Sequence, residues 1–305
     1  MSSQYFRFPV RAAAPLRSAA TPLRSAFLEQ LLARADAGRP VGDWRADAFG
    51  VIAPQAPWPG VAAAALCADC GAVDAAWVCL ATPVHYAAEM TNVRMSQDGI
   101  LSMKRADAEA LALDFNRVWN GSGIRLVAGG SARLYGIFDQ ALNVTTRDPE
   151  DVLDRYIEEY LPAGADASRL RQLMSEIEMW LFEHELNATR ADLGVARLSG
   201  LWLWGGGAPL ASLPKAQGWA EGDDVFFNAF KGEKSASGVI VASHVPGDEG
   251  WPDVEARWLR PAVSQLRAGR LSQLDLSAGD RCVTLSARAV RRFWRRRRPW
   301  WEFFA

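Results

Sequence analysis

The sequence predicts an α/β protein with a largely parallel sheet and an inserted α+β subdomain, and three observations point to it. Strand and helix patterns alternate along the chain, which favours a parallel sheet covered by helices. The apolar run AAWVCLATPV, residues 75–84, is typical of a core strand buried on both faces. After it come short strand patterns around a helix expected from Arg105 to Trp119, the profile of an inserted α+β subdomain.

Length and composition place the chain among globular proteins. It has 305 residues, half of them apolar, and a formal net charge of -1. This length suits one large domain or two smaller ones. A nearly neutral chain has no global field for nucleic acid or acidic membranes, so such attraction must come from a local patch. Because no apolar run approaches the roughly 18 to 20 residues of a spanning helix, we expect a soluble protein.

The N-terminal stretch allows two interpretations. No acidic residue precedes Glu29, and the stretch is rich in Arg, Ser and Ala, as in organellar transit peptides. The interpretation that we favour is a strand at 5–10, a basic connector and a helix that begins at Thr21 and Pro22. That helix would have an apolar face of Leu23, Phe27, Leu28 and Leu31. Because a secretory apolar core is missing, we expect a cytoplasmic protein.

The cysteines predict reduced thiols rather than a metal centre. Cys67 and Cys70 form the sequence's C-x-x-C pair, while Cys79 and Cys282 are single. A structural zinc site usually needs a second pair or nearby histidines. The pair ends a helix of small residues before Gly71, whereas a thioredoxin-like motif begins a helix. We therefore expect buried thiols in a reducing cytoplasm, with no metal and no cofactor.

Further elements complete the expected core. The segment 166–186 predicts one long helix, because apolar residues recur on one face. This face consists of Leu170, Leu173, Met174, Ile177, Trp180 and Leu181. Segments 237–245, 271–278 and 282–287 have strand patterns, and 253–269 has the pattern of a helix between the first two.

The segment LSGLWLWGGG, residues 198–207, suggests a binding position. A buried strand that stops at Gly205, Gly206 and Gly207 would expose bare backbone at the carboxyl end of a sheet, where open α/β proteins bind ligands. Backbone N–H groups without side chains suit an anion. A tight turn that packs against a neighbouring element is the alternative, and both remain open. The pattern matches neither a dinucleotide fingerprint nor a P-loop.

A longer stretch around these glycines carries a family resemblance. Residues 184–207 resemble a segment of proteobacterial proteins identified as phosphoglycerate mutase-like or as type-E regulatory proteins of pathogenicity-factor gene clusters. The matching positions are His184, Asn187, Arg190, Gly194 and residues 201–207, while Glu185 replaces a proline. The resemblance extends upstream through LPAGAD and the EIEM helix and downstream to the RFW-Arg-Arg ending. It covers most of the chain from about residue 75.

That family is similar in turn to the archaeal-type cofactor-independent phosphoglycerate mutases. The resemblance implies a reduced alkaline-phosphatase-like core formed by residues 1–85 and 187–305, with an inserted α+β subdomain at 86–186. It also implies the mutase chemistry, in which two divalent metals are held by Asp and His side chains and a Ser near the N-terminus takes the phosphoryl group. Two metals a few Å apart need several carboxylates and imidazoles.

The sequence departs from the mutases at these positions. The mutases open with a strand followed by Asp-Gly, whereas this chain has YFRFPVRAAAPL and no aspartate before Asp36. Their Asp-x-x-Gly-His-Asp segment corresponds to VPGDEGWPD, which keeps Asp248 but has Trp251 in place of histidine. Their Asp-His-x-x-Thr-Pro segment leaves Asp280 followed by Arg281. The chain holds three histidines, His85, His184 and His244, too few for a two-metal site of this type.

The candidate ligand residues follow from the glycine turn and the resemblance. The predicted anion site consists of Gly205, Gly206, Gly207, Asn187, Arg190 and His184. Asn187 and Arg190 have an alternative role in fixing the connection to the strand, and His184 in ending a helix. His85 and His244 fall where ligand loops are expected. Arg105 corresponds to an arginine-rich motif of the mutases' insert, or is a solvated residue that starts a helix.

The C-terminal segment RAVRRFWRRRRPWWEFFA, residues 288–305, has a strongly charged pattern. The candidate patch is Arg291, Arg292, Trp294, Arg295, Arg296, Arg297 and Arg298. Arginines interleaved with aromatic rings suit phosphate backbones with stacked bases, or an anionic membrane surface. The alternative is a terminal strand with Trp inward and Arg outward, followed by a packed aromatic end.

Three hypotheses of function follow. The leading one is a cytoplasmic regulatory or ligand-binding protein, a bacterial pseudoenzyme of the alkaline phosphatase superfamily, that still holds a small phosphorylated or carboxylated anion. The second is an active phosphoglycerate mutase-type isomerase or phosphatase with an atypical, metal-poor site. The third is an adaptor that binds an acidic macromolecule through the C-terminal patch.

Overall fold

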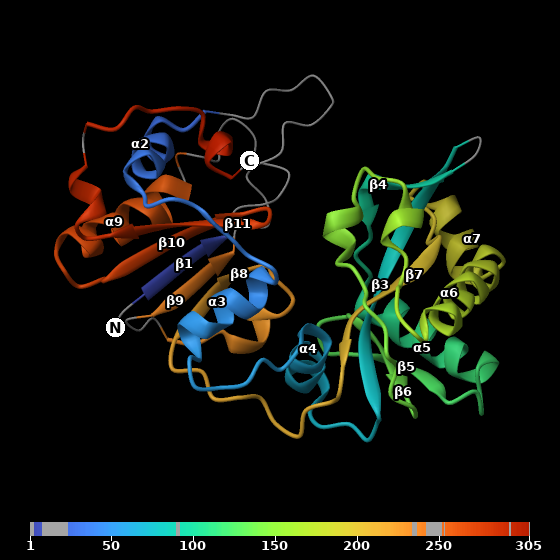
Figure 1. The fold of residues 1–305 in the computed structure, drawn as a ribbon. Helices are drawn as coiled ribbons and strands as arrows, with labels where there is room; N and C mark the ends of the chain where they lie inside the picture. Colours follow the sequence, from blue (N-terminus) through green and yellow to red (C-terminus); the bar gives the residue numbers. More distant parts are fainter. Residues whose placement is uncertain are drawn as a thin grey trace. The chain divides into compact units, whose positions relative to one another are not determined.

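The computed structural model describes residues 3–7, 24–89, 92–233, 237–241, 252, 254–292 and 294–304. They form two compact units, Met1–Trp58 with Pro214–Ala305 (unit 1) and Pro59–Leu213 (unit 2). Figure 1 shows the elements of each unit. Both units combine helices with a sheet, and the two sheets contain parallel and antiparallel pairs, so the predicted α/β class is confirmed.

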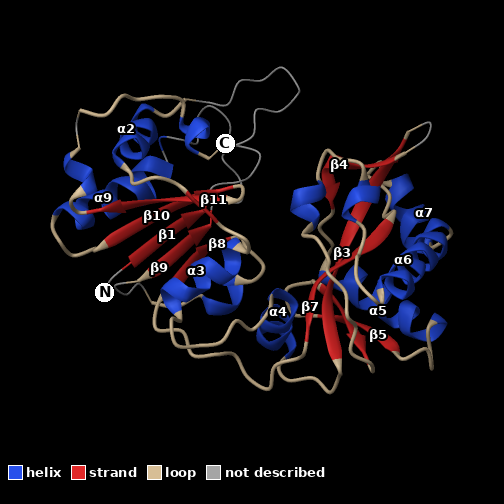
Figure 2. Cartoon of the chain, viewed as in Figure 1, coloured by secondary structure: helices blue, strands red, loops and turns tan. Residues whose placement is uncertain are grey.

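Unit 1 is built on a mostly parallel sheet. Among its described residues the strand order is β2 (Arg39–Pro40), β11 (Arg281–Ser286), β10 (Gln273–Ala278), β1 (Ser3–Arg7), β9 (Gly238–Val241) and β8 (Trp219–Gly222). The four strands from β10 to β8 run parallel, and β11 and β2 add an antiparallel edge (Figure 2). The central strand β1 comes from the start of the chain and its neighbours come from the end.

Helices cover both faces of this sheet. On one face, α2 (Ala26–Arg34) and α9 (Arg260–Arg267), which follows a π-helical turn at Glu255–Leu259, enclose a core that includes Phe6. On the other face lies α3 (Trp44–Ile52), whose Trp44 ring lies under the Arg7 guanidinium. Successive residues of a strand point to opposite faces, so Tyr5 and Arg7 share the α3 face while Phe6 enters the other core.

The start of α2 differs from the prediction. The helix begins at Ala26 rather than at Thr21, because the Ser25 hydroxyl accepts a hydrogen bond from the Leu28 amide and caps the first turn. Residues 8–23, which include the predicted basic connector, lie outside the described residues.

Unit 2 is built on an antiparallel sheet. Its described strands are β3 (Trp77–Ala88), β4 (Val93–Ile100), β5 (Ile124–Ala128), β6 (Leu134–Phe138) and β7 (Gly200–Gly207). The twelve-residue strand β3 is central, with β7 along one side and β6 and β4 along successive parts of the other. β5 extends the sheet beyond β6.

The helices of unit 2 are α4 (Val61–Cys70), α5 (Arg105–Val118), α6 (Ala167–Phe182) and α7 (Glu185–Asp192), with 3-10 turns at Pro149–Val152 and Ile157–Tyr160. The predicted apolar face of α6 is buried at Leu170, Met174, Ile177 and Leu181. The expected single helix over 166–186 is in fact interrupted after Phe182, because His184 caps a separate helix, α7.

The structure divides the chain at 58/59 and 213/214, not at the predicted boundaries 85/86 and 186/187. β3 continues from Trp77 through His85 to Ala88, and it pairs antiparallel with β7 from Val78↔Gly207 to Val84↔Gly200. The strands at 75–84 and 200–207 therefore belong to the antiparallel sheet of unit 2. A strand buried on both faces has the same apolar pattern in either kind of sheet, so the pattern could not distinguish them.

None of the helices in the described parts of the chain combines the length and the apolar character needed to cross a membrane.

Candidate functional site

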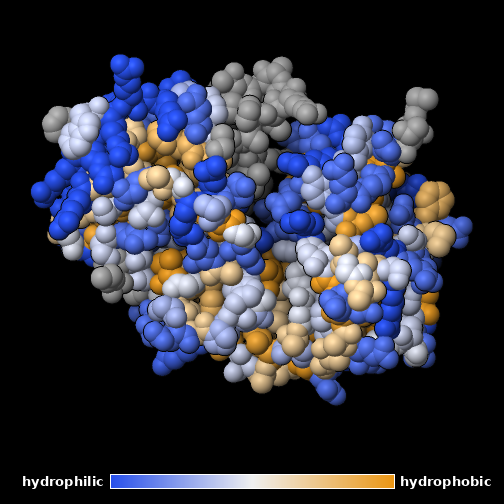
Figure 3. All heavy atoms as spheres, in the orientation of Figure 1, coloured by the Kyte–Doolittle hydropathy of each residue, from blue (hydrophilic) through white to orange (hydrophobic). Residues whose placement is uncertain are grey.

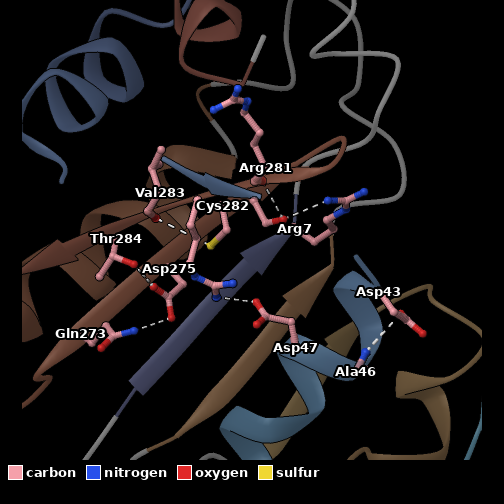
Figure 4. Close-up of polar contacts among 12 residues, drawn as sticks. Arg7, Asp43, Ala46, Asp47, Gln273, Asp275, Arg281, Cys282, Val283 and Thr284 are labelled. Atoms are coloured by element: carbon pink, nitrogen blue, oxygen red, sulfur yellow. Dashed lines mark hydrogen bonds and ion pairs between the residues drawn. The ribbon is translucent and has the colours of Figure 1, made fainter. Parts of the chain in front are cut away.

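A polar cluster lies on the α3 face of the sheet in unit 1, where the parallel strands end (Figure 4). Arg7, the last residue of β1, is buried, and its Nη1 donates to Ser277 Oγ at 2.9 Å and to the Gly279 carbonyl at 2.7 Å. Its guanidinium lies 4.7 Å from the ring centre of Trp44. The carboxyl edge of a parallel sheet is where α/β proteins bind ligands, so this cluster is the candidate site.

A second guanidinium lies on the same tryptophan. Arg45 lies 4.5 Å from the Trp44 ring centre, and its Nη2 forms a buried ion pair with Asp224 Oδ2 at 2.8 Å. Asp224 follows β8, and its other oxygen accepts hydrogen bonds from the Phe226 and Phe227 amides. The carboxylate at the end of β8 is therefore occupied by protein donors.

The N-terminus of α3 is also occupied. The Asp43 side chain accepts hydrogen bonds from the Arg45 amide at 2.9 Å and the Ala46 amide at 3.2 Å (Figure 4). A carboxylate that caps the first turn fills the position an external anion would take.

Deeper in the cluster, Asp275 is held between neighbouring side chains. One carboxylate oxygen accepts from Thr284 Oγ1 at 2.6 Å, and the other accepts from Gln273 Nε2 at 2.7 Å. Burial raises the pKa of Asp275, while these hydrogen bonds and the positive charge of Arg39 act in the opposite direction. Arg39 itself pairs with Asp47 of α3 at 2.6 Å.

Two further buried groups face the cluster. Burial raises the pKa of the Cys282 thiol to about 12, so this thiol is a poor nucleophile. Burial also raises the pKa of Tyr5, whose hydroxyl has no hydrogen bond of acceptable geometry within the described residues.

The cluster does not fit the metal pair that the resemblance implies for the mutases. Two divalent cations need several free carboxylates or imidazoles, whereas Asp224 is paired with Arg45, and Arg7 is itself a cation. In the described parts of the chain, no group of three or more His, Cys, Asp or Glu side chains could hold a metal ion. His244, Asp248 and Trp251 lie outside the described residues.

The three glycines of β7 have packing roles in unit 2. Gly205 has a φ of +66°, its amide donates to Thr146 Oγ1 at 3.0 Å, and a Cβ there would meet Val61. A Cβ on Gly206 would lie 1.9 Å from the Trp77 ring. Gly207 pairs with Val78 and has open space around its Cα. The close approach of Trp77 and Val61 accounts for two of these glycines.

The other predicted ligand residues lie near the opposite end of β7. Asn187 is buried, and its Nδ2 donates to the Leu181 carbonyl at 2.7 Å and the Leu198 carbonyl at 2.8 Å. Its Oδ1 accepts from the Leu198 amide at 2.7 Å. Arg190 Nε donates to the Ala196 carbonyl at 2.6 Å. Leu198 and Gly205 are seven residues apart along nearly extended chain, about 20 Å at 3.3 Å per residue, so these side chains do not converge with the glycines.

The histidines also differ from their predicted settings. His184 begins α7 rather than ending a helix, because its Nδ1 accepts from the Leu186 amide at 3.1 Å. Its ring packs edge-on against Trp180, with centroids 4.7 Å apart. His85 lies within β3 rather than in a loop, with Nδ1 2.9 Å from the Arg197 carbonyl.

Arg105 and the cysteine pair have surface positions. Arg105 starts α5 and pairs with Glu109 at 2.7 Å, as expected of a solvated residue that starts a helix. Cys67 and Cys70 lie in the last turn of α4 before Gly71, as predicted, but Cys70 is exposed and Cys67 half-buried. The prediction of burial is wrong for this pair because the buried part of α4 stops at Leu66. Desolvation raises the pKa of both thiols.

The C-terminal segment forms 3-10 turns at Ala289–Arg291 and Trp300–Phe303 where the alternative interpretation expected a strand. Of the predicted patch, Arg291 and Arg295 to Arg298 are exposed, while Arg292 is half-buried and pairs with Asp36. Trp300 is fully buried in the unit 1 core and anchors the segment.

Sequence reasoning missed the cluster around Arg7. Its members come from β1, α3, β8, β10 and β11, which lie far apart in the sequence. The available signal was Arg7 itself, a cation inside an apolar N-terminal strand pattern.

Comparisons with known proteins support the mutase resemblance in its broad form. No family model matches the chain. A 2,3-bisphosphoglycerate-independent phosphoglycerate mutase of Methanothrix thermoacetophila is 31% identical over 93 residues, 30% of this chain and 24% of that protein. Phosphoglycerate mutase 2 of Methanothermobacter thermautotrophicus, of the same type, is 29% identical over 136 residues, 44% of this chain and 33% of that protein. The chain thus matches a quarter to a third of the length of these relatives.

Solved structures with low overall similarity include two archaeal proteins. The cofactor-independent phosphoglycerate mutase of Thermoplasma acidophilum is 11% identical, with a TM-score of 0.39 over 94% of this chain and 90% of that chain. The PH0037 protein of Pyrococcus horikoshii is 12% identical, with a TM-score of 0.41 over 93% and 87%. The two sequence matches by themselves show weak similarity to archaeal cofactor-independent phosphoglycerate mutases.

Proposed function

We propose that the protein is a phosphoglycerate mutase-like regulatory or ligand-binding protein that does not perform two-metal phosphoryl transfer. It would belong with the proteobacterial regulatory proteins that residues 184–207 resemble. The supporting observation is Arg7 at the end of β1. The mutases place Asp-Gly after their first strand, whereas this chain places a buried guanidinium on Trp44 there. A fixed positive charge in a buried position repels a divalent cation.

The first test combines metal content with turnover. The full chain is purified from cells supplied with manganese and zinc, analysed by elemental mass spectrometry, and assayed for conversion of 3- to 2-phosphoglycerate. We expect metal well below one equivalent and no conversion above a protein-free blank. An archaeal mutase prepared in parallel must bind metal and turn over. About two metals per chain together with turnover would overturn the proposal and establish the enzyme hypothesis.

The ligand part of the proposal places a small phosphorylated anion near Arg7 rather than at the glycine turn. Arg7 is a fixed cation at the end of β1, and it donates hydrogen bonds to two neutral acceptors, Ser277 Oγ and the Gly279 carbonyl. The predicted six residues do not converge, whereas Arg7 and Arg45 share one tryptophan at the carboxyl edge of a parallel sheet.

Calorimetric titration with phosphoglycerates, inorganic phosphate and nucleotides tests this part. We expect heat from at least one of these anions and its loss in Arg7→Gln. Arg117→Gln, which removes an exposed charge from α5 of unit 2, should bind as the unaltered protein does. No heat with any anion contradicts ligand binding, and equal heat in Arg7→Gln contradicts its position.

A further inference from the structure

The end of unit 1 carries a concentrated arginine surface that the proposed function does not use. We define the arginine surface as Arg34, Arg267, Arg291, Arg292, Trp294 and Arg295 to Arg298. Figure 3 shows hydrophilic side chains gathered over the part of unit 1 where Figure 1 places α2, α9 and the C-terminal segment. The protein as a whole has a net charge of -1, so this surface is a local concentration of positive charge.

The surface is fixed in place by the C-terminal end of α2. Arg295 Nη1 donates to the Ala35 carbonyl at 2.7 Å, and Arg34 Nη1 donates to the Val290 carbonyl at 3.0 Å. The negative end of a helix dipole favours nearby cations. Together with the buried Trp300, these contacts attach the C-terminal segment to the end of α2.

The arginines lie close enough to affect one another. The pKa of Arg34 is lowered, first by burial and then by the positive charges of Arg267 and Arg297. These residues come from α2, α9 and the C-terminal segment. Like charges brought together from three segments cost stability unless an anionic partner offsets the repulsion.

An exposed tryptophan lies among these charges. Trp294 keeps 68% of its surface exposed, between Arg292 and Arg295. An exposed tryptophan with arginines on both sides in the sequence suits the interface of an anionic bilayer, where the ring lies at the headgroup level and guanidinium groups bind lipid phosphates. Clusters of four to eight basic residues are typical of such surfaces.

Nucleic acid fits the same surface less well. Single strands bind along successive exposed ring faces on which bases stack. In the described part of the segment, Arg298 lies over the Phe303 ring at 4.5 Å and Arg24 over the Trp301 ring at 5.9 Å. Trp300 is buried, and among the residues of the segment that the structure describes, Trp294 is the exposed aromatic one.

We propose that the arginine surface docks the protein onto an anionic lipid surface, with the arginines on lipid phosphates and Trp294 at the level of the headgroups. The partner is a bilayer rich in phosphatidylglycerol or a comparable acidic lipid. The contact needs neither the cluster around Arg7 nor turnover, so it stands independently of the proposed function.

Co-sedimentation of the full chain with vesicles tests the proposal. We expect binding to phosphatidylcholine vesicles that contain phosphatidylglycerol, little binding to phosphatidylcholine alone, and weakening by added salt. Arg296→Gln with Arg297→Gln should weaken binding by roughly fivefold for each arginine removed. The matched control, Arg105→Gln with Arg117→Gln, makes the same change in charge on exposed residues of unit 2 and should bind normally. Absence of vesicle binding would overturn the proposal.

A second measurement separates a bilayer from a simple polyanion. Heparin offers negative charge without an apolar interface, so Trp294→Ala should weaken vesicle binding and leave heparin binding unchanged. Equal weakening of both would contradict a bilayer contact for the ring. Binding to single-stranded RNA is compared with vesicle binding at equal phosphate concentration. If RNA binds more tightly, and if the double variant of Arg296 and Arg297 loses that binding, the surface belongs to nucleic acid and the proposal is overturned.

Discussion

At the scale of single residues, the glycines of β7 separate packing from ligand binding. A Cβ on Gly206 would overlap the Trp77 ring, whereas one on Gly207 would meet nothing within 4 Å. We therefore expect Gly206→Ala to lower the free energy of unfolding by about 1 to 3 kcal/mol, because overpacking forces a ring or backbone shift. Gly207→Ala is the matched control and should stay within about 0.5 kcal/mol of the unaltered protein.

Urea unfolding of both variants measures this difference. Equal stability of the two variants would show that Trp77 moves aside easily, and the packing account of Gly206 would then fail. The sequence predicted both a binding and a packing role for these glycines. It could not choose between them, because the ring that meets Gly206 lies 129 residues earlier in the chain.

Asp275 makes stability depend on pH with a definite sign. Burial raises its pKa in the folded state, so the neutral carboxyl is favoured by folding. The stability that this raised pKa contributes to the folded state is fully present below the ordinary pKa of about 4. It is lost as the pH rises through the raised pKa. In the Asp275→Asn variant this side chain cannot ionise. The Gln273 amide can rotate so that a hydrogen bond between the two side chains is kept.

We expect the free energy of unfolding of Asp275→Asn, relative to that of the unaltered protein, to increase as the pH rises above about 4. Urea unfolding at a series of pH values checks this. A difference that is constant with pH, or one that falls, would contradict a raised pKa.

At the scale of elements, the connection between α7 and β7 depends on one buried amide. Asn187 bonds the Leu181 carbonyl at the end of α6 and both backbone groups of Leu198 before β7. Asn187→Ala removes the Asn187 partners of the Leu198 amide and carbonyl, and each buried group left unpaired costs about 1 to 3 kcal/mol. The Leu181 carbonyl keeps its bond from the His184 amide. Arg190→Ala removes a more exposed bond to Ala196 and should cost less than about 1 kcal/mol.

Thermal and urea unfolding of these two variants distinguish a structural amide from a ligand residue. If Asn187→Ala were as stable as Arg190→Ala, the buried bonds would not hold the connection. The sequence had offered this structural role as the alternative to anion binding. Asn187 binds next to the start of β7, whereas the glycines lie at its end. The local sequence pattern does not show this placement, because it does not give the direction of the strand.

Elements were easier to predict than their partners. The apolar face of α6 and the strand at 75–84 follow from periodicity and are present. Pairing is a non-local property: β3 pairs with β7 and β6, and an apolar strand predicts neither the partner nor the direction. The break at His184 was missed because the helical pattern continues across it, while the capping bond to Leu186 depends on side-chain geometry.

At the scale of the whole molecule, the two units differ in how the chain builds them. Unit 2 is one continuous segment, and all its described strand pairs lie within residues 59–213. Unit 1 needs both ends of the chain, because β1 is placed between β10 and β9. The resemblance suggested an insert at 86–186, which omits β7 and most of β3.

This difference predicts which fragment folds alone. Residues 59–213 keep β3 with β4, β6 and β7, so we expect a monomeric fragment with cooperative urea unfolding and a strand-containing circular dichroism spectrum. Residues 86–186 retain β6 without its partner segment Trp77–Leu80, which leaves apolar strand edges open to aggregation. We expect this shorter fragment to lack a cooperative transition. If it folds while 59–213 does not, β3 and β7 do not hold unit 2 together, and the boundaries suggested by the resemblance are the physical ones.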